Sequence, residues 1–309
     1  MHTAARDDAL LRAMPAVFVL IWSTGFVVAR FGMPHAPPMG FLATRYALSV
    51  LAFLLWIVLA RAAWPQGRAQ WGHLAVTGVL MHAGYLGGVW AAVKDGLGAG
   101  LAALIVGLQP VLTALWVSSR GGGGAGHVAP RQWAGLALGL GGLVLVVWNK
   151  LHLGEASALN VGLALLALAS ITAGTLYQKR WVQPCDVRTA NTVQLAAAFA
   201  VTLPLALWES STAWGGVTMH PELVGAMAWS VLALTLGGSS LLYLLIQRGA
   251  ATAVTSLMYL VPPCTALLAW WLFDEALTPS VLAGLVLAAA GVALVVRSAP
   301  TPVTKEASP

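Results

Sequence analysis

The sequence predicts an all-α membrane protein with ten transmembrane helices, arranged as two inverted five-helix repeats. Three observations support this prediction. Of the 309 residues, 59% are hydrophobic and only 8% are charged, whereas about 25% of the residues of an ordinary soluble domain are charged. The few charges divide the chain into ten long uncharged stretches, and the two halves of the chain match each other at a nearly fixed offset.

The uncharged stretches have lengths suited to membrane helices. Most contain between about 17 and 25 residues, which is the length that crosses a hydrocarbon core about 30 Å thick. The second is short only because Arg45 interrupts a run that begins near Met39. Leu and Ala dominate throughout, and both favour helix. The predicted spans cover residues 13–29, 46–60, 69–93, 96–119, 132–149, 156–178, 189–208, 223–247, 249–273 and 276–296.

The basic residues predict the orientation in the membrane. Twelve of the 16 Lys and Arg residues lie on the side that holds both termini, and four lie on the other. By the positive-inside rule, both termini are expected to be cytoplasmic. The net charge of +6 therefore reflects topology. The basic residues are too scattered for a nucleic-acid partner, which needs a basic patch on one face.

The two halves of the chain read as an internal duplication. Gly25 aligns with Gly174 at an offset of 149 residues, and Pro110 aligns with Pro263 at an offset of 153. The first repeat is expected at 13–149, the second at 156–297, and a disordered tail at 298–309. Later in each repeat the offset returns to 149 and pairs Pro130, Gly135, Leu136, Leu138, Gly142 and Val146-Val147 with Pro279, Gly284, Leu285, Leu287, Gly291 and Val295-Val296.

This duplication predicts a carrier. Because five is an odd number, the second repeat enters the bilayer with the opposite orientation. Inverted repeats are the design of secondary transporters, in which one half rocks against the other around a site at the membrane midplane. Pores can also be built from repeats, so a channel remains an alternative.

Paired helix interruptions mark one predicted substrate site. Pro110 and Pro263 lie near the middle of equivalent helices, and proline frees a backbone carbonyl there. Such matched interruptions point to a transport site, although membrane helices also tolerate proline for other reasons. Gln109 lies beside the first interruption and Tyr259 beside the second, so both are candidate ligands of the substrate.

Other candidates are polar or aromatic side chains within the spans. Each also has a structural interpretation. A tryptophan can simply fill space between helices, a histidine can make a structural hydrogen bond, and a hydroxyl can donate to a carbonyl oxygen of its own helix. His82 lies mid-helix and shares a helix face with Tyr85; it could bind a carboxylate or take a proton. The further candidates for substrate binding are Trp22, Ser23, Trp90, Thr172, Tyr177, Ser239 and Tyr243.

Charged residues within or near the spans are few. Arg45 is expected to snorkel to the interface or to pair with Asp95; the alternative is a two-pronged contact with a substrate carboxylate. None of the ten acidic residues lies within a helix core, although proton-coupled carriers commonly use such a carboxylate. The sequence therefore favours facilitated or exchange transport, with any proton coupling left to His82 or Glu275.

Several local patterns follow one another along the chain: Trp22-Ser23-Thr24-Gly25-Phe26, Phe41 to Arg45-Tyr46, Leu260 to Pro263, Asp274-Glu275, and the helix from Ala283-Gly284-Leu285 to Gly291. Together they resemble the EamA-like family of the drug/metabolite transporter superfamily. The resemblance implies ten helices from a five-helix duplication, and the export of amino acids or other small metabolites across the inner (cytoplasmic) membrane. One departure is Arg120, which stands where the family often has an acidic residue after the fourth helix.

The remaining function classes fit less well. An intramembrane aspartyl protease needs a pair of core aspartates, which the spans lack. A Ser/His pair would need Ser23 or Ser239 to approach His82, and no G-x-S-x-G context supports it. Two cysteines in unlike surroundings provide no metal motif. We expect a transporter without catalytic residues, metal or cofactor, whose partners are a small molecule and the lipid bilayer; homo-oligomerisation stays open.

Overall fold

The computed structural model of this chain describes residues 2–120, 130–211, 216–238, 241 and 260–297. These residues are helical apart from their short connections, and no strand occurs among them. The predicted all-α fold class is therefore confirmed for this part of the chain. The expected tail at 298–309 lies outside the described residues.

In the first half, the region predicted as the third span is one continuous helix, although its centre is π-helical. The region predicted as the fourth span breaks at Gly107 and Leu108. The elements are α1 (His2–Gly32), α2 (Pro38–Ala60), α3 (Arg68–Gly78), η1 (Val79–Gly84, π-helical), α4 (Tyr85–Lys94), α5 (Ala99–Val106), α6 (Gln109–Arg120) and α7 (Pro130–His152).

The described part of the second half repeats several of these elements in the same order. Here too a π-helical segment continues an α-helix without a break, in the region predicted as the eighth span. The elements are α8 (Ala158–Trp181), α9 (Val187–Glu209), α10 (Pro221–Trp229), η2 (Ser230–Gly237, π-helical), α13 (Val261–Phe273) and α14 (Pro279–Arg297).

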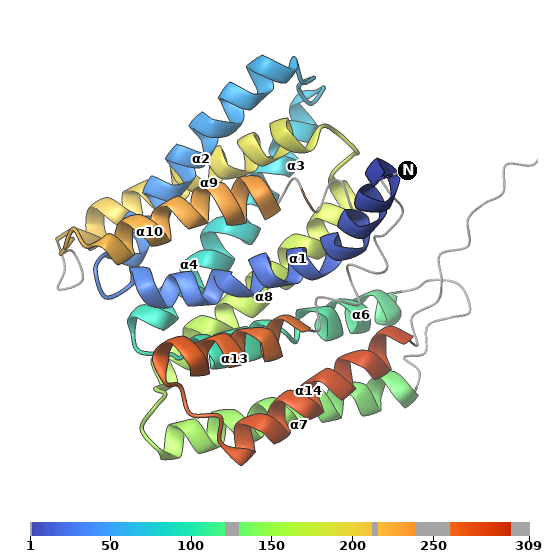
Figure 1. The fold of residues 1–309 in the computed structure, drawn as a ribbon, viewed down its shortest axis with the longest axis vertical. Coiled ribbons are helices and arrows are strands. Elements are labelled where there is room, and N and C mark those ends of the chain that lie inside the picture. Colours follow the sequence, from blue (N-terminus) through green and yellow to red (C-terminus); the bar gives the residue numbers. More distant parts are fainter. Residues whose placement is uncertain (1, 121–129, 212–215, 239–240, 242–259, 298–309) are drawn as a thin grey trace, which may run out of the picture.

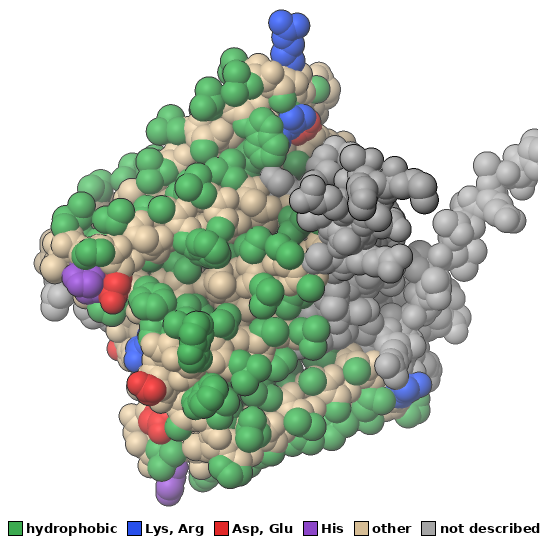
Figure 2. All heavy atoms as spheres, viewed as in Figure 1, with side chains coloured by type: hydrophobic (Ala, Val, Ile, Leu, Met, Phe, Trp, Pro, Cys, Tyr) green, Lys and Arg blue, Asp and Glu red, His purple; other side chains and the backbone are tan. Residues whose placement is uncertain are grey.

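The helices have the length and surface of membrane spans. Five helices are long and apolar enough to cross a bilayer: 38–60, 68–94, 133–152, 158–181 and 187–209. The other predicted spans contain shorter apolar helices. Large apolar side chains face outward, among them Leu59 at 75% exposed and Trp148 at 69%. Figure 2 shows the result, a broad apolar face with charged side chains gathered towards its rims. An apolar surface this extensive suits lipid rather than water.

Helix contacts repeat when each helix is exchanged for its counterpart in the other half. The counterparts α2 and α9 pack on each other, as do α7 and α14. The predicted fourth and ninth spans are also counterparts, and here α5 packs on α13. The α3–α8 contact has its equivalent in α10 against α1, the η1–α8 contact in η2 against α1, and the η1–α9 contact in η2 against α2. A two-fold relation between the halves would produce such a pattern, because each contact would then occur twice.

Glycines bring α7 and α14 into close backbone contact. A Cβ on Gly142 would lie 2.7 Å from the Gly284 carbonyl oxygen, and a Cβ on Gly291 would lie 2.4 Å from the Gly135 carbonyl oxygen. Gly135 and Gly284 are equivalent in the repeat alignment, as are Gly142 and Gly291, so exchanging each glycine for its counterpart converts one contact into the other. The crossing therefore depends on glycine at these positions.

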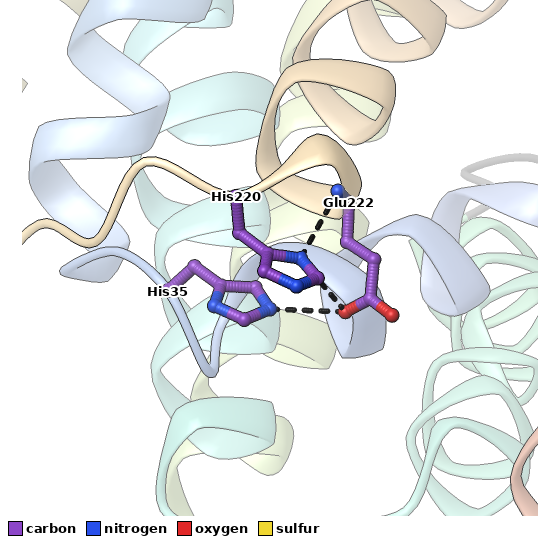
Figure 3. A group of neighbouring side chains, drawn as sticks. All are labelled: His35, His220 and Glu222. Atoms are coloured by element: carbon purple, nitrogen blue, oxygen red, sulfur yellow. Dashed lines mark hydrogen bonds and ion pairs between the residues drawn. The ribbon is translucent and has the colours of Figure 1, made fainter.

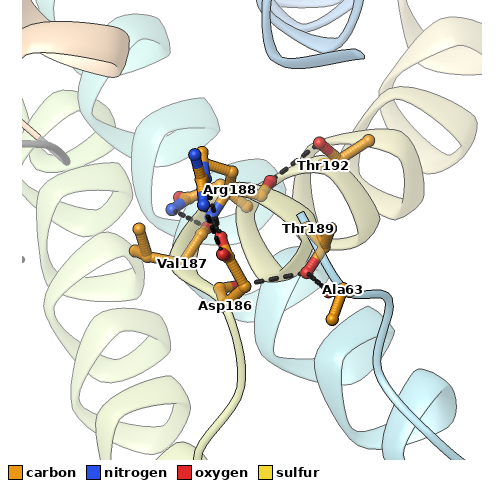
Figure 4. Close-up of polar contacts among 7 residues, drawn as sticks. Ala63, Asp186, Val187, Arg188, Thr189 and Thr192 are labelled. Carbon is orange, nitrogen blue, oxygen red and sulfur yellow. Dashed lines mark hydrogen bonds and ion pairs between the residues drawn. The ribbon is translucent and has the colours of Figure 1, made fainter. Parts of the chain in front are cut away.

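The start of α9 is fixed by the residues shown in Figure 4. Asp186 precedes the helix and accepts hydrogen bonds from the Arg188 backbone N–H at 2.9 Å and from its guanidinium at 3.0 and 2.6 Å. The Thr189 hydroxyl donates to the Ala63 carbonyl oxygen at 3.0 Å, which ties α9 to the segment after α2. Hydrogen bonds from Arg188 hold the pKa of Asp186 below its ordinary value of 3.8.

This arrangement predicts a pH-dependent contribution to stability. Asp186→Ala is expected to lower the free energy of unfolding by about 1 kcal/mol near neutral pH, because an N-cap is lost. Since the folded-state pKa is depressed, the contribution of Asp186 is fully present above the unfolded pKa. It disappears as the pH falls through the folded value. Thermal melts in detergent from pH 7 downward should show the two curves converging; a constant difference would contradict this role.

Candidate functional site

A cavity of about 130 Å³ that contains a charged side chain lies between the two halves. A single water needs only about 10–15 Å³ on this measure, so a small organic molecule can enter. The walls come from α1, α2, η1, α4, α8, α9 and η2. The lining residues are Trp22, Gly25, Phe26, Arg45, Met81, His82, Tyr85, Leu86, Val89, Trp90, Ile171, Asn191, Leu234 and Thr235.

Aromatic side chains form much of the cavity wall. Trp22 enters from α1, and Tyr85 and Trp90 enter from α4. Trp90 is 1% exposed and stacks on Phe41 of α2, with ring centroids 4.5 Å apart. Trp22 packs against Phe18 one turn earlier, at 5.4 Å. These predicted residues thus share one cavity, with aromatic surface that suits an apolar or aromatic substrate body.

Arg45 supplies the positive charge of the cavity. The residue is 7% exposed, and its Nε and Nη2 donate to the Thr235 hydroxyl oxygen at 3.4 and 3.1 Å. Thr235 in turn donates to the Ser230 carbonyl oxygen at 2.8 Å. Among the described lining residues none is Asp or Glu, so no carboxylate of the lining neutralises the guanidinium.

These contacts correct the expectation for Arg45. The side chain lines an internal cavity instead of snorkelling to the interface. Asp95 is engaged elsewhere, because its carboxylate accepts a hydrogen bond from the Ser157 hydroxyl at 3.0 Å and its carbonyl oxygen accepts one from Asn160 at 3.2 Å. The preferred prediction was therefore wrong, and the alternative, a guanidinium available to a substrate carboxylate, agrees with the geometry.

Two π-helical segments contribute to the cavity at equivalent points of the halves. Met81 and His82 come from η1, and Leu234 and Thr235 come from η2. Val79 and Ser230 begin these segments 151 positions apart, between the offsets of 149 and 153 that align the halves. Isolated π-helical turns are frequent at functional sites, because the extra residue disturbs the backbone hydrogen bonds.

Side chains take up the carbonyl groups that η1 leaves accessible. The Tyr46 hydroxyl donates to the His82 carbonyl oxygen at 2.9 Å, and the Ser170 hydroxyl donates to the Leu80 carbonyl oxygen at 2.9 Å. The His82 side chain interacts with the Gln194 amide. His82 is thus held by a structural network and also borders the cavity.

The predicted proline site lies apart from this cavity. The Pro110 interruption appears as the break before α6, and Pro263 lies in the first turn of α13. Pro263 lines a separate space of about 10 Å³, which is at the limit for one water. The Gln109 amide donates to the Thr175 hydroxyl at 3.2 Å. The space that Pro263 lines is therefore too small for a substrate.

Four other predicted residues have local structural contacts. The Ser23 and Thr172 hydroxyls donate to carbonyl oxygens one turn earlier in their own helices, both at 2.7 Å. Tyr177 hydrogen-bonds His73 at 2.9 Å. The Glu275 carboxylate accepts from the first backbone N–H groups of α5 at 2.8 and 3.2 Å and so caps that helix. Ser239, Tyr243 and Tyr259 lie outside the described residues.

The polar residues opposite Arg45 were not predicted from the sequence. Thr235 was one hydroxyl among many, and its partner Arg45 lies 190 positions away. Asn191 lines the cavity, and Gln194 lies one turn later on α9. Two amides spaced for one helix face within an apolar span are a signal that could have identified this wall.

Comparisons with known proteins give the family. The model of the EamA-like transporter family matches residues 13–148 and again residues 159–297. An uncharacterized transporter of Archaeoglobus fulgidus is 23% identical over 84% of this chain and 88% of its own length. A probable amino-acid metabolite efflux pump of Salmonella typhimurium is 26% identical over 93% and 94%, and the uncharacterized inner membrane transporter YedA of Escherichia coli K12 is 27% identical over 88% and 87%.

A solved crystal structure supports the fold. It superposes with a TM-score of 0.62 over 95% of this chain and 99% of its own, at 18% sequence identity. The two family matches cover most of the chain and agree with the multi-pass apolar helices described above. The chain belongs to the EamA-like transporter family.

Proposed function

We propose that this protein is a secondary transporter that exports a small carboxylate-bearing metabolite, such as an amino acid, across the inner membrane. The observation that carries the proposal is the Arg45 guanidinium, buried in a cavity whose described lining holds no acidic residue. A carboxylate can accept two parallel hydrogen bonds from a guanidinium. Such a substrate would supply the negative charge that the cavity lacks.

The rest of the cavity suits the remaining groups of an amino acid. Trp22, Tyr85 and Trp90 offer aromatic faces to an apolar body. Asn191 and Thr235 bring amide and hydroxyl groups to the same space. The name of the Salmonella relative, a probable amino-acid metabolite efflux pump, supports the same substrate class.

Alternating access is the mechanism we propose. Ten spans in two inverted repeats, 13–149 and 156–297, would place both termini in the cytoplasm and the cavity at the repeat interface. The exchangeable helix contacts, the reciprocal glycine crossing and the paired π-helical segments support this arrangement. With no carboxylate in the described lining, we propose facilitated or exchange transport rather than proton transfer through a buried acid.

Counterflow in proteoliposomes tests this function. Vesicles loaded with unlabelled L-phenylalanine and diluted into labelled L-phenylalanine should accumulate label transiently, and the initial rate should saturate. A panel of other amino acids and carboxylates, added outside, would rank the substrates by competition. Flux that neither saturates nor responds to substrate on the far side, together with conductance, would instead indicate a channel.

A further inference from the structure

We propose that His35, His220 and Glu222 form a binding site for a divalent transition metal ion of the Zn²⁺ class. The site lies at the end of the helix bundle that carries the α1–α2, α4–α5, α7–α8 and α13–α14 connections, called the loop face below (Figure 1). Figure 3 shows both histidine rings and the carboxylate gathered at one point. None of the three residues lines the Arg45 cavity. The proposal is independent of the transport function.

The three side chains have the chemistry that Zn²⁺ prefers. Two imidazole nitrogens and one carboxylate oxygen are an established ligand set for zinc sites that keep a fourth position for water. Within the described residues this is the only group of three or more His, Cys, Asp or Glu side chains whose ligand atoms come this close together.

The distances allow one ion to reach all three side chains. His35 Nε2 lies 2.9 Å from Glu222 Oε2, and His220 Nδ1 lies 3.7 Å from the same oxygen. All three ligand atoms lie within 4.8 Å of one another. Around a tetrahedral ion with bonds of about 2.0–2.1 Å, ligand atoms are about 3.3 Å apart. Adjustments of about 1.5 Å or less therefore suffice.

The backbone holds the ligands together without an ion. The Thr218 N–H donates to the His35 carbonyl oxygen at 2.8 Å, so the segment before α10 is attached to the α1–α2 connection. The Glu222 N–H donates to His220 Nδ1 at 3.3 Å, so this nitrogen carries no proton, and it would exchange this long hydrogen bond for the ion. The fold thus already holds the three side chains near one another, which reduces the conformational entropy lost when an ion binds.

The side chains also have room to move and access to solvent. The two imidazole rings are stacked, with centroids 4.3 Å apart and planes 10° from parallel, so they must tilt before both lone pairs point at one ion. The His220 and Glu222 side chains are each 46% exposed, and that of His35 is 17% exposed. This exposure permits the tilt and lets an ion enter from outside the bundle.

The site would join two parts of the chain that are distant in sequence. His35 and Glu222 are 187 positions apart. His35 follows α1, whereas His220 and Glu222 begin α10, and an ion between them would fix these ends to each other. An ion that binds only the folded state also raises the melting temperature.

Metal titration of the purified protein tests the site. The full chain, carrying an affinity tag without histidine and freed of metal by a chelator, would be titrated with Co²⁺ by absorbance and with Zn²⁺ by calorimetry. We expect one ion per chain and a higher melting temperature with Zn²⁺. His35→Ala should weaken binding by at least about tenfold, and His35→Cys should restore it and add a thiolate-to-cobalt absorption band.

A second histidine provides the matched control. His152 is exposed, ends α7 beside another connection of the loop face, and stacks on Trp148 with ring centroids 6.4 Å apart. His152→Ala should bind Co²⁺ and Zn²⁺ like the wild type. The proposal is overturned if the wild type binds neither ion, if His35→Ala binds as tightly as the wild type, or if His152→Ala loses as much affinity as His35→Ala. His35 and Glu222 would then be only a hydrogen-bonded contact.

Discussion

Replacing Arg45 with alanine is expected to reduce L-phenylalanine counterflow at least about tenfold. Hydrogen bonds to a charged group contribute about 1.5–3 kcal/mol each, and every 1.4 kcal/mol corresponds to a factor of about ten in affinity. Arg45→Lys should retain part of the activity, because it keeps the charge but loses the planar two-pronged donor. Initial rates at several substrate concentrations in proteoliposomes would measure both effects.

The control for this prediction is an arginine outside the cavity. Arg68 is exposed at the start of α3, so Arg68→Ala should transport L-phenylalanine at the wild-type rate. Reconstituted protein levels and melting temperatures must match among the variants, since removal of a buried side chain can also affect folding. Arg45→Ala with normal counterflow at a normal protein level would exclude Arg45 from substrate recognition.

A larger side chain at the α7–α14 crossing is expected to cause the greatest loss of stability. A Cβ on Gly142 already meets the Gly284 carbonyl oxygen at 2.7 Å and the Leu287 Cβ at 2.8 Å. Backbone atoms cannot turn away as a flexible side chain can. Gly142→Leu should therefore lower the free energy of unfolding by about 3 kcal/mol, the upper part of the usual range for overpacking. Thermal melts followed by size-exclusion chromatography in detergent would measure the loss.

The adjacent glycine provides a strict comparison. A Cβ on Gly141 meets no atom within 4 Å, so Gly141→Leu keeps the same helix, depth and added volume without the collision. We expect this variant to melt at or above the wild-type temperature, because leucine favours helix more than glycine. Equal melting temperatures for the two variants would contradict the close approach of α7 and α14.

The sequence predicted the helices because their signal is local. A run of about 20 uncharged residues identifies a span wherever its neighbours lie, and the glycines around Gly142 and Gly291 marked their two helices as equivalent in the repeat alignment. Trp22, His82, Tyr85 and Trp90 were chosen as polar or aromatic residues within spans, and all four line the cavity. Local composition was sufficient for these predictions.

The remaining features depend on long-range contacts or on backbone detail. The hydroxyl that accepts from Arg45 lies 190 positions away, and nothing in the sequence around Arg45 distinguishes a cavity from the interface. The π-helical segments η1 and η2 contain no proline, so the sequence gives no sign of them. The predicted substrate site at Pro110 and Pro263 relied on proline, but the space that Pro263 lines is small.

Substrate protection of a cysteine in the cavity tests the central claim most directly. Leu234 lines the cavity, whereas Leu232 on the same η2 segment is 64% exposed on the outer surface. With Cys185 and Cys264 replaced by serine, Leu234→Cys should react with a membrane-permeant maleimide more slowly in L-phenylalanine. 2-Phenylethylamine, which lacks the carboxylate, should not slow it, and Leu232→Cys should react at the same rate throughout. Equal protection by both compounds, or protection by neither, would contradict a carboxylate-binding cavity at Arg45.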